Sequence, residues 1–448
     1  MTPQSTRYRT FRAALAAIAL ILTLGSMGWA ASEEVLYRFH GTDGWSPNSV
    51  ILGPDGALYG TTTVGGAYGG ASYGGVVFQL IHKADGKWQE TVLHSFDSSN
   101  GNAPVGPLVA DKEGNLYGTT FYGGPNGCSG LGCGVAFELV RGQGGKWTYE
   151  ILHLFFQQAG DGAQPLAGMI FDSQGNLYGT TSHGGNTGAC PGGCGVVFEL
   201  SPDGKGNWTE TVPYSFSGKD GEWPSAPLVF DPAGDLFGET EQGGAHGWGT
   251  VFRLSLSGGQ WSHEILHSFD ETDGQQPYSG VTLDGKGSLY GTAPLGGAHT
   301  WGVAFKLTPA GSGKWKETIL RSFDRAKFGG GDVSSGLTLG ANGNFYGTTN
   351  WGGRYDCPLG GGLGCGVVFS LTQQKNGRWD EAVLHSFGEG DDGAFPGGLA
   401  LDSLGNLFGV GLGGYTGGSC AVTGGCGTVF EIAVVIPNWP VDILAVPK

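Results

Sequence analysis

One phrase recurs through the chain. The sequence Gly-Asn-Leu-Tyr-Gly-Thr-Thr at 114–120 returns at 175–181 and, with Phe in place of Leu, at 343–349. Reduced to an apolar residue, an aromatic residue and a glycine, the phrase occurs seven times, at intervals of 53–62 residues. Its aromatic residues are Tyr59, Tyr117, Tyr178, Phe237, Tyr290, Tyr346 and Phe408. A repeat of this length indicates an array of similar supersecondary units.

Two further phrases accompany each copy. A Gly-Gly and then a Gly-x-Val/Ala-Phe follow it, and a phrase of the form Trp-x-Glu-Thr-Val-Leu-His-Ser-Phe connects it to the next copy. In the second unit we expect four strands, at 107–110, 115–120, 134–140 and 147–155, because these runs of β-branched and aromatic residues are bounded by turn residues. No stretch after the N-terminal segment keeps a 3.6-residue apolar period long enough for a helix.

Four strands per unit and seven units predict an all-β fold, a seven-bladed β-propeller of four-stranded blades. A β-solenoid is the alternative architecture, although its coils are usually shorter. The repeated phrase itself is predicted to be structural. Gly-Asn would supply a turn, Leu and Tyr would alternate across the inner strand, and the next glycine would allow close approach of neighbouring backbones.

The two ends of the chain predict how the ring closes. The run at 34–39 matches the end of the fourth-strand phrase, whereas the last unit stops after 427–434 without a clear copy. We therefore expect the N-terminal strand to pair into the blade of residues 399–434 and to remove the open edges of the ring. A weaker alternative is that 438–446 fills this place, with Trp439 as the repeat tryptophan.

The first 30 residues have the order of a secretory signal peptide: three arginines, an apolar run from Ala13 to Leu24, and small residues before cleavage after Ala30. An uncleaved N-terminal anchor is the alternative. We expect the propeller to occupy 31–436, a C-terminal tail to occupy 437–448, and the mature protein to be monomeric and not inserted in a membrane. Cleavage removes three arginines and no acid, so the net charge of −16 becomes −19, which disfavours nucleic acid and anionic lipid as partners.

Together these phrases resemble the bacterial GloVer tandem-repeat family, over about residues 34–434. The resemblance implies export and a propeller-like repeat fold, and it transfers no catalytic residues. Members often carry a C-terminal anchor, but 436–448 contains neither an apolar span nor a basic tail. The expected location is therefore secreted, or periplasmic or at the cell surface. A looser likeness to kelch repeats comes from the Gly-Gly and the later tryptophan.

The eight cysteines form four local pairs, each between a Gly-Gly and a Gly-x-Val/Ala-Phe or its equivalent in the last unit. The pairs are Cys128 with Cys133, Cys190 with Cys194, Cys357 with Cys365, and Cys420 with Cys426. An exported chain with an even number of cysteines favours disulfides. Zinc is the alternative, although no Cys-x2-Cys pair is present.

A ligand site is expected on one face of the ring. In an up-and-down blade, the loop between the second and third strands and the connection to the next blade emerge on the same face. The former loops include 65–75, 243–249 and 296–302, and the connections carry an Asp/Asn-Gly-x-x-Pro phrase in most units. The candidate ligand-binding residues on this face are Trp45, Tyr68, Tyr73, Asp220, Trp223, His246, Trp248, Asp273, His299 and Trp301.

Flat aromatic rings beside carboxylates suit sugars, whose C–H faces stack while their hydroxyls form hydrogen bonds. The loops of units four and five share Ala-His-x-Trp-Gly, which predicts His246 and Trp248 beside His299 and Trp301 in the adjacent blade. The competing interpretation is that the aromatic residues cover loop cores and the aspartates cap turns. Calcium binding by the aspartates is a further alternative, but one carboxylate per blade does not converge on one point.

The fourth-strand phrase also carries repeated polar residues, which we predict to be structural because the position accepts different residue types. They are Tyr37, His94, His153, Tyr214, His267, Arg321 and His385. Enzyme motifs are weak: 70–74 fits Gly-x-Ser-x-Gly and 409–414 fits Gly-x-Gly-x-x-Gly, but neither has the helix that its motif requires, and chance matches are expected among 90 glycines.

The sequence therefore predicts a secreted binding module for an extracellular carbohydrate, without cofactor or metal, whose partner is a polysaccharide or a protein. The first alternative is a glycan hydrolase or lyase on the same face, which would use carboxylates from different blades and His246 or His299. The second alternative is a structural protein of the cell envelope.

Overall fold

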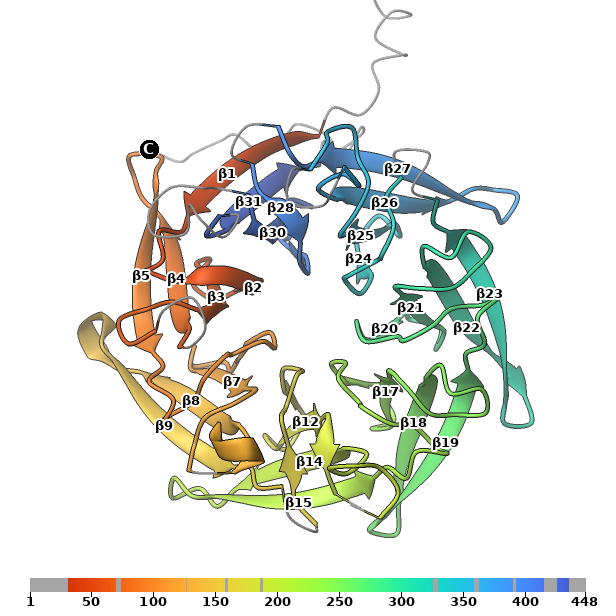
Figure 1. Ribbon diagram of the computed structural model, residues 1–448, viewed down its shortest axis with the longest axis horizontal. Helices are drawn as coiled ribbons and strands as arrows, with labels where there is room; N and C mark the ends of the chain where they lie inside the picture. The colour runs from red at the N-terminus through yellow and green to blue at the C-terminus, as the bar shows by residue number, and fades with distance from the viewer. Residues whose placement is uncertain are drawn as a thin grey trace, which may run out of the picture.

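The computed structural model describes residues 31–69, 74–125, 127–157, 160–185, 188–324, 329–357, 362–389, 392–414 and 425–434. Seven antiparallel sheets stand around a central opening (Figure 1). The predicted all-β, seven-bladed propeller is thus confirmed. The predicted signal peptide at 1–30 and the predicted tail at 437–448 lie outside the described residues. Within the described part of the chain, no helix has the length and apolar character needed to cross a membrane.

From the axis outward, blade one consists of β2 (Trp45–Leu52), β3 (Leu58–Val64), β4 (Val76–His82) and β5 (Trp88–Ser95). Blade two consists of β6 (Val109–Ala110), β7 (Leu116–Thr120), β8 (Val135–Arg141) and β9 (Trp147–Leu154). Blade three consists of β11 (Ile170–Phe171), β12 (Leu177–Thr181), β14 (Val196–Pro202) and β15 (Trp208–Ser215). The short strands β10 (Gly162–Ala163) and β13 (His183–Gly184) pair separately. The innermost strand of blade two is shorter than predicted, with two residues, and the innermost strands of blades three to six have the same length.

Blade four consists of β16 (Val229–Phe230), β17 (Leu236–Thr240), β18 (Thr250–Ser257) and β19 (Gln260–Ser268). Blade five consists of β20 (Thr282–Leu283), β21 (Leu289–Ala293), β22 (Val303–Gly311) and β23 (Lys314–Ser322). Blade six consists of β24 (Thr338–Leu339), β25 (Phe345–Thr349), β26 (Val367–Gln373) and β27 (Trp379–Ser386). Blade seven contains β28 (Ala394–Pro396), β29 (Ala400–Leu401), β30 (Leu407–Gly413), β31 (Thr428–Ala433) and β1 (Ser32–Arg38).

The N-terminal strand closes the ring, as predicted. β1 pairs antiparallel with β31, with Ser32 opposite Ala433 and Arg38 opposite Thr428. The two strands lie side by side although they come from opposite ends of the chain (Figure 1). The alternative segment, 438–446, lies outside the described residues. This pairing gives blade seven its fourth strand, which would otherwise be missing.

The repeated glycine allows a close approach inside each blade, although its main neighbour is a side chain and not the predicted backbone. A Cβ atom added to Gly118 would lie 2.6 Å from Cζ of Phe137, the phenylalanine of the Gly-x-Val/Ala-Phe phrase. All seven units repeat this contact, as Gly179 with Phe198 illustrates. The leucine and the tyrosine before the glycine are both buried, because neighbouring blades cover both faces of each sheet.

The same phenylalanine also joins the blades. It meets the phenylalanine that ends the fourth-strand phrase of the preceding blade, with ring centroids 5.0–5.4 Å apart at all seven interfaces. Edge-on aromatic pairs of this kind stabilise by about 0.5–1.5 kcal/mol beyond their burial. One such pair, Phe39 with Phe78, joins the last blade to the first and so completes the ring.

The fourth-strand polar residues lie at the outer part of the interfaces, where each faces one residue of the next blade's fourth strand. In ring order the facing pairs are Tyr37 and Glu90, His94 and Tyr149, His153 and Glu210, Tyr214 and His263, His267 and Glu317, Arg321 and Glu381, and His385 and Glu33. This position contributes to packing between blades in every unit, which agrees with its predicted structural role.

Three of the predicted disulfides are present: Cys128–Cys133, Cys190–Cys194 and Cys357–Cys365. Cys426 is disulfide-bonded too, and its predicted partner Cys420 lies outside the described residues. Each described bridge closes a loop within one blade, with sequence separations of 4–8 residues. Disulfides are typical of chains that fold in an oxidising compartment.

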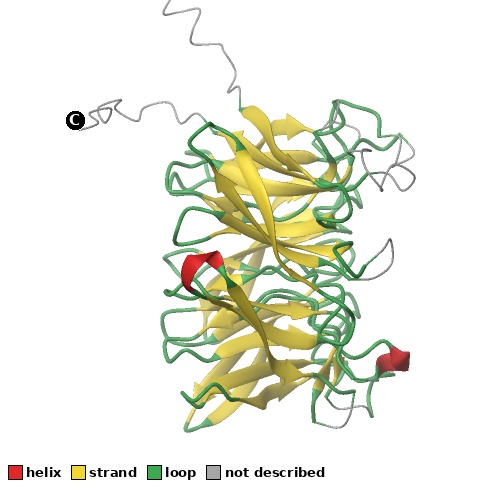
Figure 2. Ribbon diagram, turned by 90° about the vertical axis from the view of Figure 1, so that its left-hand side faces the viewer, coloured by secondary structure: helices red, strands yellow, loops and turns green. Residues whose placement is uncertain are grey.

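The loops of a blade divide between the two faces of the ring. Two short 3-10 turns mark this division: Cys128–Gly130 lies between the second and third strands of blade two, and Gln143–Gly145 lies between its third and fourth strands. Figure 2 shows these two turns on opposite faces. We call the face that carries the loops between second and third strands the loop face.

Candidate functional site

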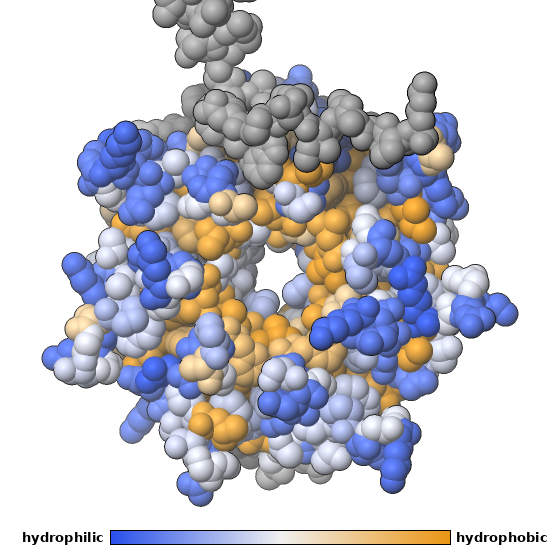
Figure 3. Space-filling view, turned by 180° about the vertical axis from the view of Figure 1, so that it is seen from behind, coloured by the Kyte–Doolittle hydropathy of each residue, from blue (hydrophilic) through white to orange (hydrophobic). Residues whose placement is uncertain are grey.

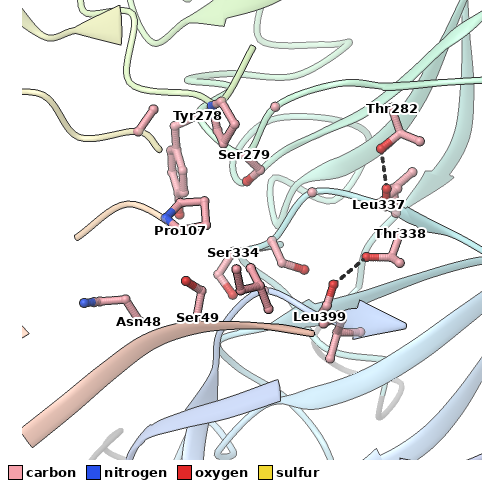
Figure 4. Close-up of a pocket in the computed structure, with 18 of the residues that line it drawn as sticks. Asn48, Ser49, Pro107, Tyr278, Ser279, Thr282, Ser334, Leu337, Thr338 and Leu399 are labelled. Atoms are coloured by element: carbon pink, nitrogen blue, oxygen red, sulfur yellow. Dashed lines mark hydrogen bonds between the residues drawn. The ribbon is translucent and has the colours of Figure 1, made fainter. Parts of the chain in front are cut away.

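The ring encloses a central cavity with a volume of about 750 Å³. Every blade contributes to its wall through the segment that leads into, or forms, its innermost strand. The lining segments are 48–52, Val105 and Pro107, 166–167, Ser225 with 227–228, 278–282, 334–338 and 398–401, together with Glu241. Hydroxyl groups link blades along this wall: Thr282 Oγ1 donates to the carbonyl of Leu337 and Thr338 Oγ1 donates to that of Leu399 (Figure 4).

One residue per blade has the same unusual backbone conformation at the loop-face entrance to this cavity. The residues are Ser46, Ala103, Gln164, Trp223, Gln276, Asp332 and Phe395, and we call them the mouth ring. Their φ angles lie between 53° and 59°, a left-handed region that costs non-glycine residues about 1–2 kcal/mol. In the first six blades the residue two positions later lines the cavity. The mouth ring therefore surrounds the entrance.

Backbone hydrogen bonds hold each mouth-ring residue in place. Its N–H donates to a carbonyl at the end of the preceding blade's loop between second and third strands, as Gln276 does to Trp248 (2.9 Å) and Asp332 does to Trp301 (2.9 Å). All seven blades make this bond. It confirms that the predicted loops and the blade connections meet on one face. The backbone is thus repeated seven times, while the side chains differ in almost every blade.

Several mouth-ring side chains contact residues at the end of a second strand. The Trp223 ring lies 5.8 Å from the His183 ring, and the Phe395 ring lies 5.1 Å from that of Trp351. Asp332 accepts a 3.0 Å hydrogen bond from the side-chain amide of Asn350. Burial raises the pKa of Asp332, although its bond with Asn350 opposes this effect. The mouth ring therefore presents aromatic rings and a carboxyl group whose pKa is raised.

A second carboxyl group lies where the mouth passes into the cavity. Glu241 lines the cavity, and its carboxylate accepts a hydrogen bond from Ser225 Oγ at 2.5 Å. Burial raises the pKa of Glu241. Burial also raises the pKa of Tyr278, and the charges of Asp332 and Glu241 add to this effect. Nearby, Ser279 Oγ is buried and has no hydrogen-bond partner among the described residues.

One more carboxyl group is buried behind the wall. Glu239 occupies the place that threonine takes in most units, and Gly280 N–H donates to its Oε2 at 2.8 Å. Thr180 and Thr292, at the same place, instead donate to a carbonyl of the next blade. Glu239 is fully buried, and burial raises its pKa to about 8 against the opposing bonds from Gly280 and Ser279.

The predicted tryptophans are on the loop face. Trp248 and Trp301 have equivalent places on successive blades, where each ends a loop and accepts the mouth-ring hydrogen bond. Both are partly buried, and Trp248 packs against the interface of blades four and five. Trp45, which precedes mouth-ring residue Ser46, is partly buried against the interface of blades seven and one. Trp223 belongs to the mouth ring itself.

The other predicted residues differ in their surroundings. His246 and His299 are exposed in their loops, and Tyr68 is 71% exposed. Tyr73 lies outside the described residues. The carboxylates of Asp220 and Asp273 make bonds within the chain: Asp220 accepts from Tyr214 Oη (2.5 Å) and Ser217 N–H, while Asp273 accepts from Asp270 N–H (2.7 Å) and contacts His267.

Sequence reasoning overlooked the carboxyl groups at the mouth and in the wall. Glu239 and Glu241 interrupt the repeated Gly-Thr-Thr as Gly-Glu-Thr-Glu, and Asp332 stands in a unit that has valine in place of the connection's proline. A comparison of the units with one another could have found these three residues, since each departs from the repeat. The φ angle shared by the mouth ring leaves no comparable trace in the sequence.

One face of the ring is apolar near its axis (Figure 3). The face seen from behind in Figure 3 is apolar around the central opening and becomes hydrophilic toward the rim of the blades.

A family model described as the Gloeobacter/Verrucomicrobia repeat matches residues 26–131 and 126–357. These matches span more than half of the chain, so the chain belongs to this repeat family, in agreement with the resemblance seen in the sequence. Among curated proteins, none matches the chain.

Several solved structures resemble the chain at low sequence identity, with TM-scores below 0.5. A candidate 6-phosphogluconolactonase from Bacteroides uniformis is 13% identical, with a TM-score of 0.47 over 81% of this chain and 89% of its own. A protein of unknown function from Dyadobacter fermentans is 11% identical, with a TM-score of 0.44 over 90% and 100%. The PQQ-bound aldose sugar dehydrogenase of Streptomyces coelicolor is 14% identical, with a TM-score of 0.42 over 90% and 98%.

Proposed function

We propose that this protein is a secreted binding module for an extracellular carbohydrate, which it binds at the mouth ring and in the adjoining part of the central cavity. The observation that carries the proposal is the mouth ring. Seven residues share one left-handed backbone conformation, yet none is glycine, the residue that adopts this conformation without strain. Strained residues of this kind concentrate at ligand sites, where the side chain contributes to function.

The chemistry of the mouth suits a sugar. Trp223 and Phe395 offer flat apolar faces to C–H groups, whereas Gln164, Gln276 and Asp332 offer hydrogen-bond donors and acceptors to hydroxyls. Below them, Ser279 lines the cavity, and its buried Oγ has no hydrogen-bond partner among the described residues. The cavity volume of about 750 Å³ lies within the range of about 300–1,000 Å³ typical of small-ligand sites.

The second candidate function is a glycan hydrolase or lyase at the same place. The raised pKa of Glu241 and that of Asp332 favour this candidate, because a raised pKa makes a carboxyl group better suited to act as a general acid. Binding and catalysis would use the same surface. They differ in whether the ligand remains intact.

Affinity electrophoresis tests the binding proposal. The full chain is run through native gels that each contain one soluble polysaccharide: a β-glucan, a xylan, a galactomannan or a pectin. We expect at least one polysaccharide to retard the protein. We expect the apparent affinity calculated from this retardation to fall at least tenfold in each of the variants Trp223→Ala, Trp248→Ala and Trp301→Ala. Leu404→Ala is the matched control, because Leu404 is 76% exposed in the turn between β29 and β30, which opens on the opposite face.

Melting temperatures of the variants separate loss of binding from loss of folding, since Trp248 is partly buried. Folded variants that bind as well as the unmodified protein would remove the proposed site. If Glu241→Gln abolished cleavage of a polysaccharide while binding persisted, the enzyme candidate would replace the binding module.

A further inference from the structure

Two blade interfaces place a histidine and two carboxylates together at their outer edge. Between blades two and three these residues are His153, Asp161 and Glu210, and between blades four and five they are His267, Asp273 and Glu317. In each group one ligand atom from every residue lies within 4.8 Å of the other two. Histidine and glutamate come from the fourth strands of successive blades, and the aspartate comes from the connection between them. Each group therefore ties two blades together.

The distances are close to those around a metal ion. His267 Nε2 lies 3.0 Å from Asp273 Oδ2 and 3.9 Å from Glu317 Oε1, and His153 Nε2 lies 3.3 Å from Asp161 Oδ1. Around a tetrahedral ion with bonds of about 2.0–2.2 Å, neighbouring ligand atoms are about 3.3–3.6 Å apart. The remaining pairs of ligand atoms lie within 4.8 Å of each other, so the glutamates would have to move inward to complete such an arrangement.

The hydrogen bonding of the carboxylates also favours a role as metal ligands. The second oxygen of each aspartate accepts a backbone N–H, from Phe156 in one group and from Asp270 in the other. Such outer hydrogen bonds orient a metal ligand. Conversely, Glu210 Oε1 and Glu317 Oε1 are buried and have no hydrogen-bond partner among the described residues. A buried acceptor atom without a donor lowers the stability of the folded protein, and a cation would provide the missing partner.

We infer that each of these two groups binds one divalent transition-metal ion, of which Zn²⁺ is the best match, and that the ions strengthen the blade interfaces. Imidazole together with carboxylates suits Zn²⁺. This inference departs from our sequence-based expectation that the protein binds no metal. It is independent of the proposed carbohydrate site, because the two groups lie at the outer strands and not at the mouth ring.

The equivalent interface between blades five and six supports the need for a cation. Here the histidine is replaced by Arg321, whose guanidinium lies 2.7 Å from Glu381. The protein thus supplies its own positive charge to the buried glutamate at this interface. At the interfaces of His153 and His267, a bound ion would have the role that the guanidinium has here.

Metal content and calorimetry test the inference. The full chain is purified without a histidine tag, treated with EDTA and titrated with ZnCl₂. We expect two bound equivalents of Zn²⁺ and a melting temperature that rises with Zn²⁺ concentration. Glu210→Gln and Glu317→Gln should each reduce the stoichiometry to one equivalent. Glu381→Gln changes the same position at the arginine interface and should leave two. His246→Ala with His299→Ala, which removes exposed histidines, should also leave two.

If a variant fails to fold, measurements on the unmodified protein are still sufficient to overturn the inference. Absence of bound Zn²⁺, or a melting temperature that does not respond to Zn²⁺, would show that the groups are ion pairs between blades. Zn²⁺ binding that both glutamine variants leave at two equivalents would place the ions elsewhere and equally refute the assignment. Co²⁺ offers a spectroscopic check: its visible absorption should change when either glutamate is replaced.

Discussion

Arg321 of the fifth blade forms an ion pair with Glu381 of the sixth, with Nε 2.7 Å from Oε2. The Glu381 side chain is only 7% exposed, whereas that of Arg321 is 33% exposed. Burial raises the pKa of Glu381 and the arginine lowers it. The carboxylate therefore depends on Arg321 for its charged state within the interface.

Arg321→Ala should destabilise the protein by about 2–3 kcal/mol. Loss of one partner of a fully buried ion pair costs about 3–5 kcal/mol, and the partial exposure of Arg321 reduces this figure. Denaturant unfolding at pH 7 measures the change. Addition of Glu381→Gln to the variant should restore part of the loss, because the remaining buried group is then neutral.

Arg378 provides the control for this prediction. Its ion pair with Asp380 has the same distance, 2.7 Å, but its side chain is 71% exposed. Surface pairs contribute about 0–1 kcal/mol, so Arg378→Ala should have little effect. Equal effects of Arg321→Ala and Arg378→Ala would contradict the importance of burial at the interface.

Glu239 should make stability depend on pH. Its pKa is raised to about 8 in the folded protein, above the ordinary value near 4.5, so the folded state keeps a proton that the unfolded state releases. The free energy of unfolding should therefore fall as pH rises from about 4.5 to about 8 and level off above that. Each pKa unit corresponds to about 1.4 kcal/mol, which sets an upper limit of about 5 kcal/mol for this residue.

Glu239→Gln isolates this contribution from those of other carboxyl groups. The variant keeps the shape but cannot ionise, so the unmodified protein should lose stability relative to it between pH 5 and pH 8.5. Glu239→Thr, which restores the residue of most other units, should remove the same dependence. Parallel pH profiles for the unmodified protein and both variants would show that Glu239 does not titrate in this range.

Reduction of the disulfides should lower the melting temperature by only a few degrees. The described bridges close loops of 4–8 residues within single blades. The loop-entropy model gives a stabilisation of about 2 kcal/mol for each bridge that closes such a short loop. Calorimetry with and without dithiothreitol measures the shift. Complete unfolding on reduction would mean that the bridges are required for the ring itself.

Much of the fold could be predicted from the sequence, because the repeat determines it. The glycine of each unit packs against the same phenylalanine seven times, so one correct interpretation applies to every blade. The closing strand was predictable for a related reason, since Phe39 completes a contact that the repeat requires. The length of β6 was not predictable in the same way: this innermost strand has only two residues, as in blades three to six.

The candidate site was only partly predictable. Trp223, Trp248 and Trp301 could be assigned to one face from loop order alone. The hydrogen bonds that Asp220 and Asp273 make with the fourth strand and the turn could not be predicted from the repeat. Glu241 and Asp332 were missed because their role depends on the cavity, which residues from seven distant segments form together.

The molar mass of a soluble polysaccharide, measured by light scattering before and after overnight incubation with the protein, tests the proposed function most directly. The binding module predicts a rise in mass that scales with protein concentration, leaves the polysaccharide intact and disappears in Trp223→Ala. A fall in the mass of the polysaccharide would contradict the binding module in favour of an enzyme. An unchanged mass across β-glucan, xylan, galactomannan and pectin would contradict carbohydrate binding itself.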